Sequence, residues 1–204
     1  MMLASEALTG STLTFSLLAS LGLILVNGAF VAYEFALITA NRSVFEAKAE
    51  AGGRIARAAV ASQSDLSMQL AGAQVGITAA SLVLGDVGEP AVASIIESII
   101  GTSLSEDVTR VMGFVVALSI VAFLHLVIGE MVPKNIAIAA PVVAVTWLVL
   151  PYRAYLAIVR PFVLLLSWLA RLGCQLVGVE PRDELVSNHT AAELSAIVSS
   201  AFEE

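Results

Sequence analysis

The sequence is poor in cysteine, histidine and charged residues, and each shortage excludes a class of protein. Its 204 residues include one cysteine, Cys174, and two histidines. One cysteine excludes an internal disulfide, and a single thiol is no metal cluster. Without clustered histidine and cysteine ligands, a zinc or copper site is excluded as well. Only 13% of the residues are charged while 58% are hydrophobic, and the mean hydropathy is +0.92, which places the chain among membrane proteins.

The recognisable motifs of catalysis are missing too. The sequence has no nucleophile-elbow motif, no phosphate-binding loop and no zinc-binding helix motif, so we expect no enzyme. No nucleic-acid partner is expected either. The N-terminus lacks a basic region and a small-residue cleavage site ahead of its first apolar run, and we interpret that run as a retained membrane span.

Three apolar stretches are long enough to cross a bilayer core of roughly 30 Å, which needs about 20 helical residues. They are residues 13–39, 66–84 and 108–128. A fourth stretch, 136–150, would reach only about 22 Å as a helix. The sequence therefore predicts an all-α integral membrane protein with three transmembrane helices.

Proline and arginine interrupt the apolar sequence that follows the fourth stretch. Pro151, Arg153, Arg160 and Pro161 occur within eleven residues of one another. This pattern favours a juxtamembrane helical hairpin, bent and lying in the interface, or short helices packed beside the spans.

Basic residues are unevenly distributed between the predicted spans. Four lie between the first and second spans and five follow the third. The segment between the second and third spans is acidic, with Arg110 as its only base. The positive-inside rule places the 40–65 loop and the C-terminal part in the cytoplasm, and the N-terminus and the acidic segment outside. We accordingly predict a multi-pass protein of the plasma membrane, with the lipid bilayer as a partner.

The chain divides into two predicted regions. Residues 1–180 form the transmembrane domain, and residues 181–204 begin a cytoplasmic acidic helical bundle. Thr190 and Glu193 have the spacing of a capping box at the start of this bundle. Because the chain stops in the middle of the amphipathic pattern, we expect further domains in the full protein. Residues 43–61 are predicted to form a cytoplasmic helical connector that starts at a Ser43 cap.

The string Gly129-Glu130-Met131-Val132-Pro133-Lys134 closes the third span. A carboxylate at this place is costly unless a cation, a proton or buried water accompanies it. Pro133 removes a backbone donor and disfavours helical geometry at the residue before it. We therefore predict a helix break with free carbonyls beside Glu130, and membrane proteins build ion sites from such parts.

Polar side chains also recur at helical spacing in the spans. Asn27 and Glu34 are seven residues apart and share one face of the first span. Further polar residues are Gln74, Thr78 and Ser81 on the second span, and Ser119, His125 and Glu130 on the third. Their convergence predicts an oxygen-rich pocket suited to Mg²⁺ or Na⁺, because hard cations prefer oxygen ligands.

Several of these residues also have a purely structural interpretation. Serine, threonine and glutamine in membrane helices most often serve packing and interhelical hydrogen bonds. His125 fits a hydrogen-bonded core residue better than a ligand. Glu34 could pair with Arg42 or cap the next helix. Lys134 could mark the cytoplasmic boundary, or neutralise carbonyls and carboxylates at the break.

Three motifs resemble those of a known family. The run from Asn27 to Leu37, Asn-Gly-Ala-Phe-Val-Ala-Tyr-Glu-Phe-Ala-Leu, resembles the first-helix motif of the CorC/CNNM transmembrane domain. Gln74-Val75-Gly76-Ile77-Thr78 and the Gly129–Lys134 string are similar to its second- and third-helix motifs. Asn27 together with the ending Glu-Phe-Ala-Leu resembles the hemolysin-like branch, although nothing in the sequence indicates a lytic segment.

The resemblance implies three transmembrane helices, a juxtamembrane hairpin and a homodimer with one cation site per subunit. Downstream CBS domains, absent from this chain, would bind ATP. The best understood members of the family are similar to Na⁺-driven Mg²⁺ exporters. They hold a largely dehydrated Mg²⁺ with first-helix serines, a second-helix asparagine, the glutamate of the third-helix motif and backbone carbonyls.

Carried over by position, Glu130 and the carbonyl of Gly129 match the family ligands directly. Asn27 stands where the family often has its first serine, and Ser81 where it often has the asparagine. Val31 replaces the second serine and cannot ligate. Asn27 could supply the missing amide oxygen from the facing helix, or the site could be weakened or changed in its ion preference.

Two functions therefore stay open. The first is Na⁺-coupled Mg²⁺ export by alternating access, with Glu130 as central ligand beside Asn27, Ser81 and Gly129, and with Pro133 as hinge. Residues that could support coupling or orient the ligands are Glu34, Gln74, Thr78, Ser119, His125 and Lys134. The alternative is a non-transporting membrane scaffold or sensor whose cytoplasmic domains read nucleotide or Mg²⁺.

Overall fold

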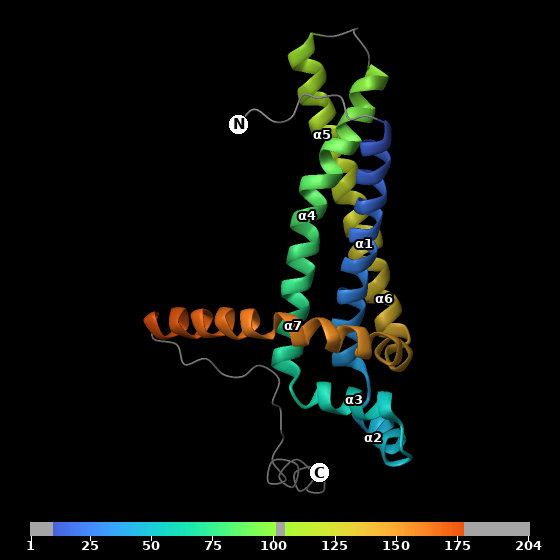
Figure 1. The fold of residues 1–204 in the computed structure, drawn as a ribbon, viewed down its shortest axis with the longest axis vertical. Helices are drawn as coiled ribbons and strands as arrows, with labels where there is room; N and C mark the ends of the chain where they lie inside the picture. Colours follow the sequence, from blue (N-terminus) through green and yellow to red (C-terminus); the bar gives the residue numbers. More distant parts are fainter. Residues whose placement is uncertain (1–9, 101–104, 178–204) are drawn as a thin grey trace, which may run out of the picture. The chain divides into compact units, whose positions relative to one another are not determined.

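The computed structural model describes residues 10–100 and 105–177, and every regular element in this part of the chain is helical (Figure 1). The predicted all-α class is confirmed. The elements are α1 (Gly10–Thr39), α2 (Arg42–Glu50), α3 (Arg54–Gln63), α4 (Leu66–Ile100), α5 (Glu106–Leu124), the π-helix η2 (His125–Met131), α6 (Val132–Ala139) and α7 (Pro141–Leu176). The chain forms two compact units, of which the first ends at Ser167 and the second begins at Trp168. The predicted bundle at 181–204 lies outside the described residues.

Within residues 10–100 and 105–177, four helical stretches, one more than predicted, are long and apolar enough to cross a membrane. They are Gly10–Thr39, Leu66–Ile100, Glu106–Ala139 and Pro141–Leu176. The expected bent hairpin is wrong, because α7 is one helix that continues through Pro151 and Pro161. Each proline removes only one helical hydrogen bond, which flanking turns and packing can offset. Within the first unit, residues 141–167 of α7 cross α1 and α4 transversely (Figure 1).

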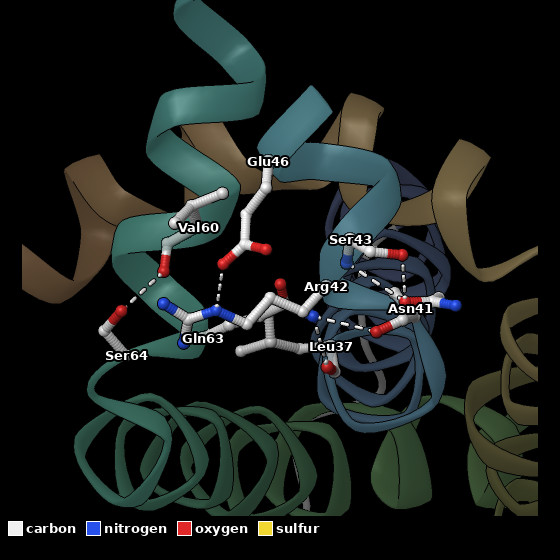
Figure 2. Close-up of polar contacts among 9 residues, drawn as sticks. Leu37, Asn41, Arg42, Ser43, Glu46, Val60, Gln63 and Ser64 are labelled. Carbon is white, nitrogen blue, oxygen red and sulfur yellow. Dashed lines mark hydrogen bonds and ion pairs between the residues drawn. The ribbon is translucent and has the colours of Figure 1, made fainter. Parts of the chain in front are cut away.

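The predicted connector between the first two spans is two helices rather than one. The chain turns between α2 and α3 at Gly52, whose φ of 91° lies in the left-handed region that favours glycine. The cap of α2 is Asn41 and not Ser43. Its side-chain oxygen accepts a hydrogen bond of 3.0 Å from the Ser43 amide, which would otherwise lack a partner in the first turn (Figure 2).

Side-chain contacts fasten the connector to the end of α1. Gln63, the last residue of α3, donates from Nε2 to the Ala40 carbonyl at 2.9 Å and to the Leu37 carbonyl at 3.4 Å (Figure 2). Arg42 pairs with Glu46 at 2.7 Å within α2, so the considered pairing of Arg42 with Glu34 is not observed. These bonds hold α2 and α3 at the end of α1 where α4 begins.

Helix α4 is much longer than the predicted second span. Its 35 residues extend about 52 Å at 1.5 Å per residue, which exceeds a hydrocarbon core of roughly 30 Å. The predicted acidic loop is therefore mostly helical, since Asp86, Glu89 and Glu97 lie on α4. Glu106 and Asp107 occupy the first turn of α5, where negative charge is favourable. The helix continues past the apolar stretch because it packs against α5.

An aromatic cluster joins α1, α4 and α7 at the connector end. Tyr33 and Tyr152 stack with ring centroids 3.9 Å apart, and the Tyr33 hydroxyl donates to Gln69 Oε1 at 3.0 Å. The hydroxyl of Tyr152 donates to the Gln69 carbonyl, and that of Tyr155 to the Gly72 carbonyl at 3.1 Å. A side chain at Gly72 would collide with Tyr152, so this glycine permits the crossing of α7 over α4.

Candidate functional site

The third span contains a π-helical segment where a break was predicted. The chain remains helical through Pro133, and Val132 has φ −64° and ψ −51°, so both the break and the non-helical Val132 are wrong. The Val132 amide donates to the carbonyl of Val127, five residues back, which is the spacing of a π-helix. The widened turn accommodates the proline ring without ending the helix. Such segments occur frequently at functional sites.

Asn27 occupies the position that Pro133 leaves open. In an α-helix the Gly129 carbonyl would accept a hydrogen bond from the amide of residue 133, which proline does not have. Asn27 Nδ2 instead donates to the Gly129 carbonyl at 2.9 Å. Asn27 is only 1% exposed. The sequence prediction that Asn27 and Gly129 belong to one polar site is consistent with this contact.

Two glycines lie where α1 approaches the π-helical segment. A β-carbon on Gly28 would stand 2.8 Å from Pro133 Cγ, which is too short for an unstrained contact. A β-carbon on Gly129 would stand 3.1 Å from the His125 ring of its own segment and 3.4 Å from Asn27 Nδ2, an ordinary contact. Gly28 therefore sets the helix separation at which Asn27 can reach the Gly129 carbonyl.

Ser81 and His125 extend the polar contact to α4. The Ser81 hydroxyl lies 3.3 Å from Asn27 Oδ1, 3.1 Å from His125 Nε2 and 2.8 Å from the Ile77 carbonyl. The Ser81 hydroxyl has one proton and can donate to only one of these acceptors at a time. The His125 tautomer decides whether Nε2 donates a hydrogen bond to this hydroxyl or accepts one from it. The interpretation of His125 as a hydrogen-bonded residue agrees with this geometry. We call Asn27, Ser81, His125 and Gly129 the polar cluster.

The polar cluster can offer three neutral oxygens to a cation. They are the Asn27 amide oxygen, the Ser81 hydroxyl and the Gly129 carbonyl, from three separate elements. Hard cations such as Mg²⁺ and Na⁺ bind oxygens of these types, and Mg²⁺ commonly keeps several waters. Among the described residues no group of three or more His, Cys, Asp or Glu side chains converges. The donor set therefore fits a hard cation better than a transition metal.

Each cluster oxygen is already engaged by a neighbour. Asn27 binds the Gly129 carbonyl through its amide nitrogen, while its amide oxygen faces the Ser81 hydroxyl. A cation would have to replace at least the Ser81–Asn27 bond to gain two ligands. Exchange of one set of bonds for another keeps the free-energy change of binding small, which suits a site that must also release its ion.

Glu130 lies beside the polar cluster in the chain, but its side chain points elsewhere. It is exposed on the chain surface and has no hydrogen-bond or ion-pair partner among the residues described. Gln74, Thr78 and Ser119 are also exposed. The structure thus brings together four of the predicted site residues, those of the polar cluster. The side chains of Glu130, Gln74, Thr78 and Ser119 lie outside it.

Glu34 of α1 and Lys134 of α6 lie near one another beyond the polar cluster. Glu34 is half-buried, and the Lys134 charge acts on its carboxylate. Lys134 Nζ also lies 4.3 Å from the centre of the Phe35 ring, a cation–π contact. Of the two interpretations considered for Lys134, the neutralisation of a nearby carboxylate agrees with this arrangement.

Sequence reasoning missed the tyrosines that position α7. Tyr33, Tyr152 and Tyr155 were not singled out, although Tyr152 and Tyr155 are three residues apart and therefore neighbours on one helix face. These tyrosines could have been found from their hydroxyls, because a tyrosine hydroxyl buried between helices requires a hydrogen-bond acceptor.

Fold and site together define a multi-pass α-helical membrane protein with a candidate cation site between α1, α4 and η2. The chain belongs to the CNNM family. Residues 18–204 match the family described as Cyclin M transmembrane N-terminal domain. Members of this family are membrane proteins linked to divalent-cation transport, and the predicted family resemblance is confirmed.

Bacterial relatives match nearly the whole chain. The uncharacterized protein Rv1841c of Mycobacterium tuberculosis is 41% identical over 189 residues, which are 93% of this chain and 54% of the relative. The UPF0053 protein YhdT of Bacillus subtilis is 32% identical over 181 residues, 88% of this chain and 39% of the relative. The chain thus spans about half, or less, of the length of these relatives.

Proposed function

We propose that this chain is the membrane part of a divalent-cation transporter whose substrate is Mg²⁺. The observation that carries the proposal is the polar cluster, in which three oxygen donors from α1, α4 and η2 meet beside a π-helical turn. Neutral polar groups in membrane helices most often serve helix packing, but oxygens contributed by three separate elements are also the ligands that a hard cation prefers. The family supplies the link to divalent cations.

Each residue has a defined part in the proposed transport. Asn27 and Ser81 bind Mg²⁺ through their side-chain oxygens, and Gly129 through its carbonyl. Glu130, which is exposed in this structure, would turn inward to act as the central ligand and supply the negative charge that the neutral cluster lacks. Gly129 and Pro133 form the compliant point of the third span, where the wide turn already departs from α-helical bonding. Na⁺ entry provides the driving force for Mg²⁺ export.

A homodimer would shield from lipid the polar side chains that a single copy exposes. Gln74, Thr78, Ser119 and Glu130 are exposed on membrane-spanning helices, where lipid contact is unfavourable for polar groups. A second copy or an aqueous passage would solvate them. We therefore propose that the protein is a homodimer of the plasma membrane, with its N-terminus outside and α2 and α3 in the cytoplasm. ATP binding belongs to CBS domains outside this chain.

Flux measurements test the proposal directly. Full-length protein in liposomes loaded with a Mg²⁺-sensitive dye should move Mg²⁺ when a Na⁺ gradient is imposed. Asn27→Leu should reduce the initial rate by about tenfold or more, the scale of loss when a residue that orients a metal ligand is removed. Glu130→Gln should lower it at least as far.

A matched control lies on the same helix as Asn27. Thr39 is exposed, and its hydroxyl bonds only to carbonyls of α1 itself, at 2.7 Å and 3.5 Å. Thr39→Val should leave the Mg²⁺ flux within twofold of wild type. Equal flux in wild type, Asn27→Leu and Glu130→Gln would overturn the proposed ligand set, and absence of flux in all of them would overturn the transporter.

A second candidate function rests on a specific observation. The polar cluster is saturated by its own hydrogen bonds and Glu130 lies outside it, as expected for a rigid scaffold or sensor. In that case Mg²⁺ would raise the melting temperature of the full-length protein through its cytoplasmic domains. The rise would survive both Asn27→Leu and Glu130→Gln, and liposomes would show no flux.

A further inference from the structure

A basic cavity lies between the connector and α7. It has a volume of about 310 Å³ and is lined by Arg54 and Arg57 of α3, Arg153 of α7, Ala58 and Ala61. Arg153 donates from Nη1 to the Ala58 carbonyl at 3.3 Å, which links the two elements across the cavity. Three exposed arginines from two elements thus line one open cavity at the surface of the protein.

No carboxylate lines this cavity. Arg42 pairs with Glu46 and Arg110 with Glu106, and neither pair involves the cavity arginines. Asp65 lines an adjoining cavity of about 240 Å³, together with Arg153 and Arg160. Three cations against no lining anion repel one another, and an added anion would relieve that repulsion.

The position of the cavity is set by the membrane. Only two residues separate Gln63, the end of α3, from Leu66, where α4 enters its apolar stretch. The connector joins two membrane-length helices, so the cavity lies at the surface of the bilayer.

Helix α7 presents three different faces at this level. Tyr152 and Leu156 are buried against the other helices. Arg153 and Arg160 are seven residues apart and share the neighbouring face. Trp147 and Ile158, eleven residues apart, share a third face and are 78% and 79% exposed. A buried stripe, a basic stripe and an exposed apolar stripe are typical of a helix that lies in the membrane interface.

We propose that this cavity binds a phosphate-bearing anion, and that its source is the headgroup of an anionic phospholipid. Guanidinium groups bind phosphate oxygens in a bidentate fashion, and α3 and α7 supply three of them. Basic cavities between membrane elements on the cytoplasmic side are suited to such headgroups. The exposed apolar face of α7 lies where the acyl chains of the same lipid would run. The site is separate from the polar cluster and does not depend on cation transport.

Native mass spectrometry of the full-length protein in detergent tests the site. Phosphatidylglycerol is titrated against phosphatidylcholine, with inorganic phosphate in a separate arm. Arg57→Gln should weaken phosphatidylglycerol binding about fivefold, the effect of one basic residue near a charged lipid surface. Arg57→Gln with Arg153→Gln should weaken it about twenty-fivefold if the two contributions add.

Lys48→Gln is the matched control. Lys48 is an exposed cation of the same connector, on α2 and outside the cavity, so its loss should change lipid affinity less than twofold. Arg57→Lys keeps the charge but cannot bind phosphate oxygens in a bidentate fashion, so its affinity should fall between those of wild type and Arg57→Gln. Unchanged affinity of the double variant, or equal retention of phosphatidylcholine, would overturn the site. Displacement of the lipid by micromolar inorganic phosphate would overturn the lipid source. Circular dichroism and gel filtration check that each variant is folded.

Discussion

Pro133 removes one backbone amide from the third span, and the side chain of Asn27 supplies a donor in its place. The contact works only because α1 comes close, and that closeness depends on Gly28 facing the proline ring. A residue on one helix thus repairs the hydrogen bonding of another. With its nitrogen held by the Gly129 carbonyl, the Asn27 amide directs its oxygen to the Ser81 hydroxyl.

Substitution of Gly28 tests this close approach. The added methyl group of Gly28→Ala would meet Pro133 Cγ at 2.8 Å, and a proline ring cannot swing aside as a flexible side chain can. We expect a loss of about 1–3 kcal/mol in stability, the usual effect of overpacking. Thermal unfolding of the detergent-solubilised protein measures it.

Gly22→Ala is the control on the same helix. A β-carbon on Gly22 meets nothing within 4 Å, so its melting temperature should equal or slightly exceed that of wild type. If Gly28→Ala melts like Gly22→Ala, the glycine does not set the helix separation.

The residues of the polar cluster could be predicted from the sequence in part. Asn27, Ser81 and His125 stand out as polar groups in apolar spans, whereas the Gly129 carbonyl was expected as a ligand from the family resemblance. The direction of Glu130 could not be predicted. It depends on the π-helical turn, which shifts the side chains that follow it and leaves no local sequence pattern beyond Pro133.

Helix α7 shows how tertiary contacts override a local signal. Pro151 and Pro161 predicted a bent hairpin, yet the helix continues through both. Tyr152 and Tyr155 bind carbonyls of α4, and Gly72 leaves room for them. The contacts join residues 83 positions apart, so no window of sequence around the prolines contains them.

Removal of the two hydroxyls tests this anchoring. Tyr152→Phe and Tyr155→Phe should each cost about 1 kcal/mol, the net value of a buried hydrogen bond. Hydrogen exchange of the α7 amides in the double variant should quicken more than that of α1.

The comparison variant on α7 is Trp147→Phe. Trp147 is 78% exposed and touches no part of α4 that the hydroxyls bind, so exchange should stay as in wild type. Equal exchange in the double tyrosine variant and in wild type would show that packing alone holds α7.

At the scale of the whole molecule, the order of the elements fixes which segments share a membrane face. α1 and α4 pack together and are joined by the connector, so α2 and α3 lie at one end of the pair. α5 packs against α4 and begins at the other end, as Figure 1 shows. The predicted spans agree with α1, α4 and the α5–α6 stretch, whereas the sequence could not show that α4 continues beyond the hydrocarbon core.

Cysteine labelling tests the orientation. Cys174 is the only cysteine of these 204 residues, so Cys174→Ser removes every thiol from this chain. Asp107→Cys should react with a membrane-impermeant maleimide in intact cells. Lys48→Cys should react only after permeabilisation, because the positive-inside rule places the connector in the cytoplasm. Reaction of both in intact cells would contradict the topology.

The π-helical segment from His125 to Met131 also has a dynamic meaning. A π turn holds one residue more than an α turn, so it behaves as a movable insertion in the helix. When such an insertion migrates past a residue, that side chain rotates by about 100° and advances about 1.5 Å, while both helix ends stay in place. A carboxylate beside the insertion, as Glu130 is, could exchange between the outer surface and the interior by this screw motion alone. Transport would then require the π turn to migrate along the helix, and the helix would not have to tilt as a rigid body.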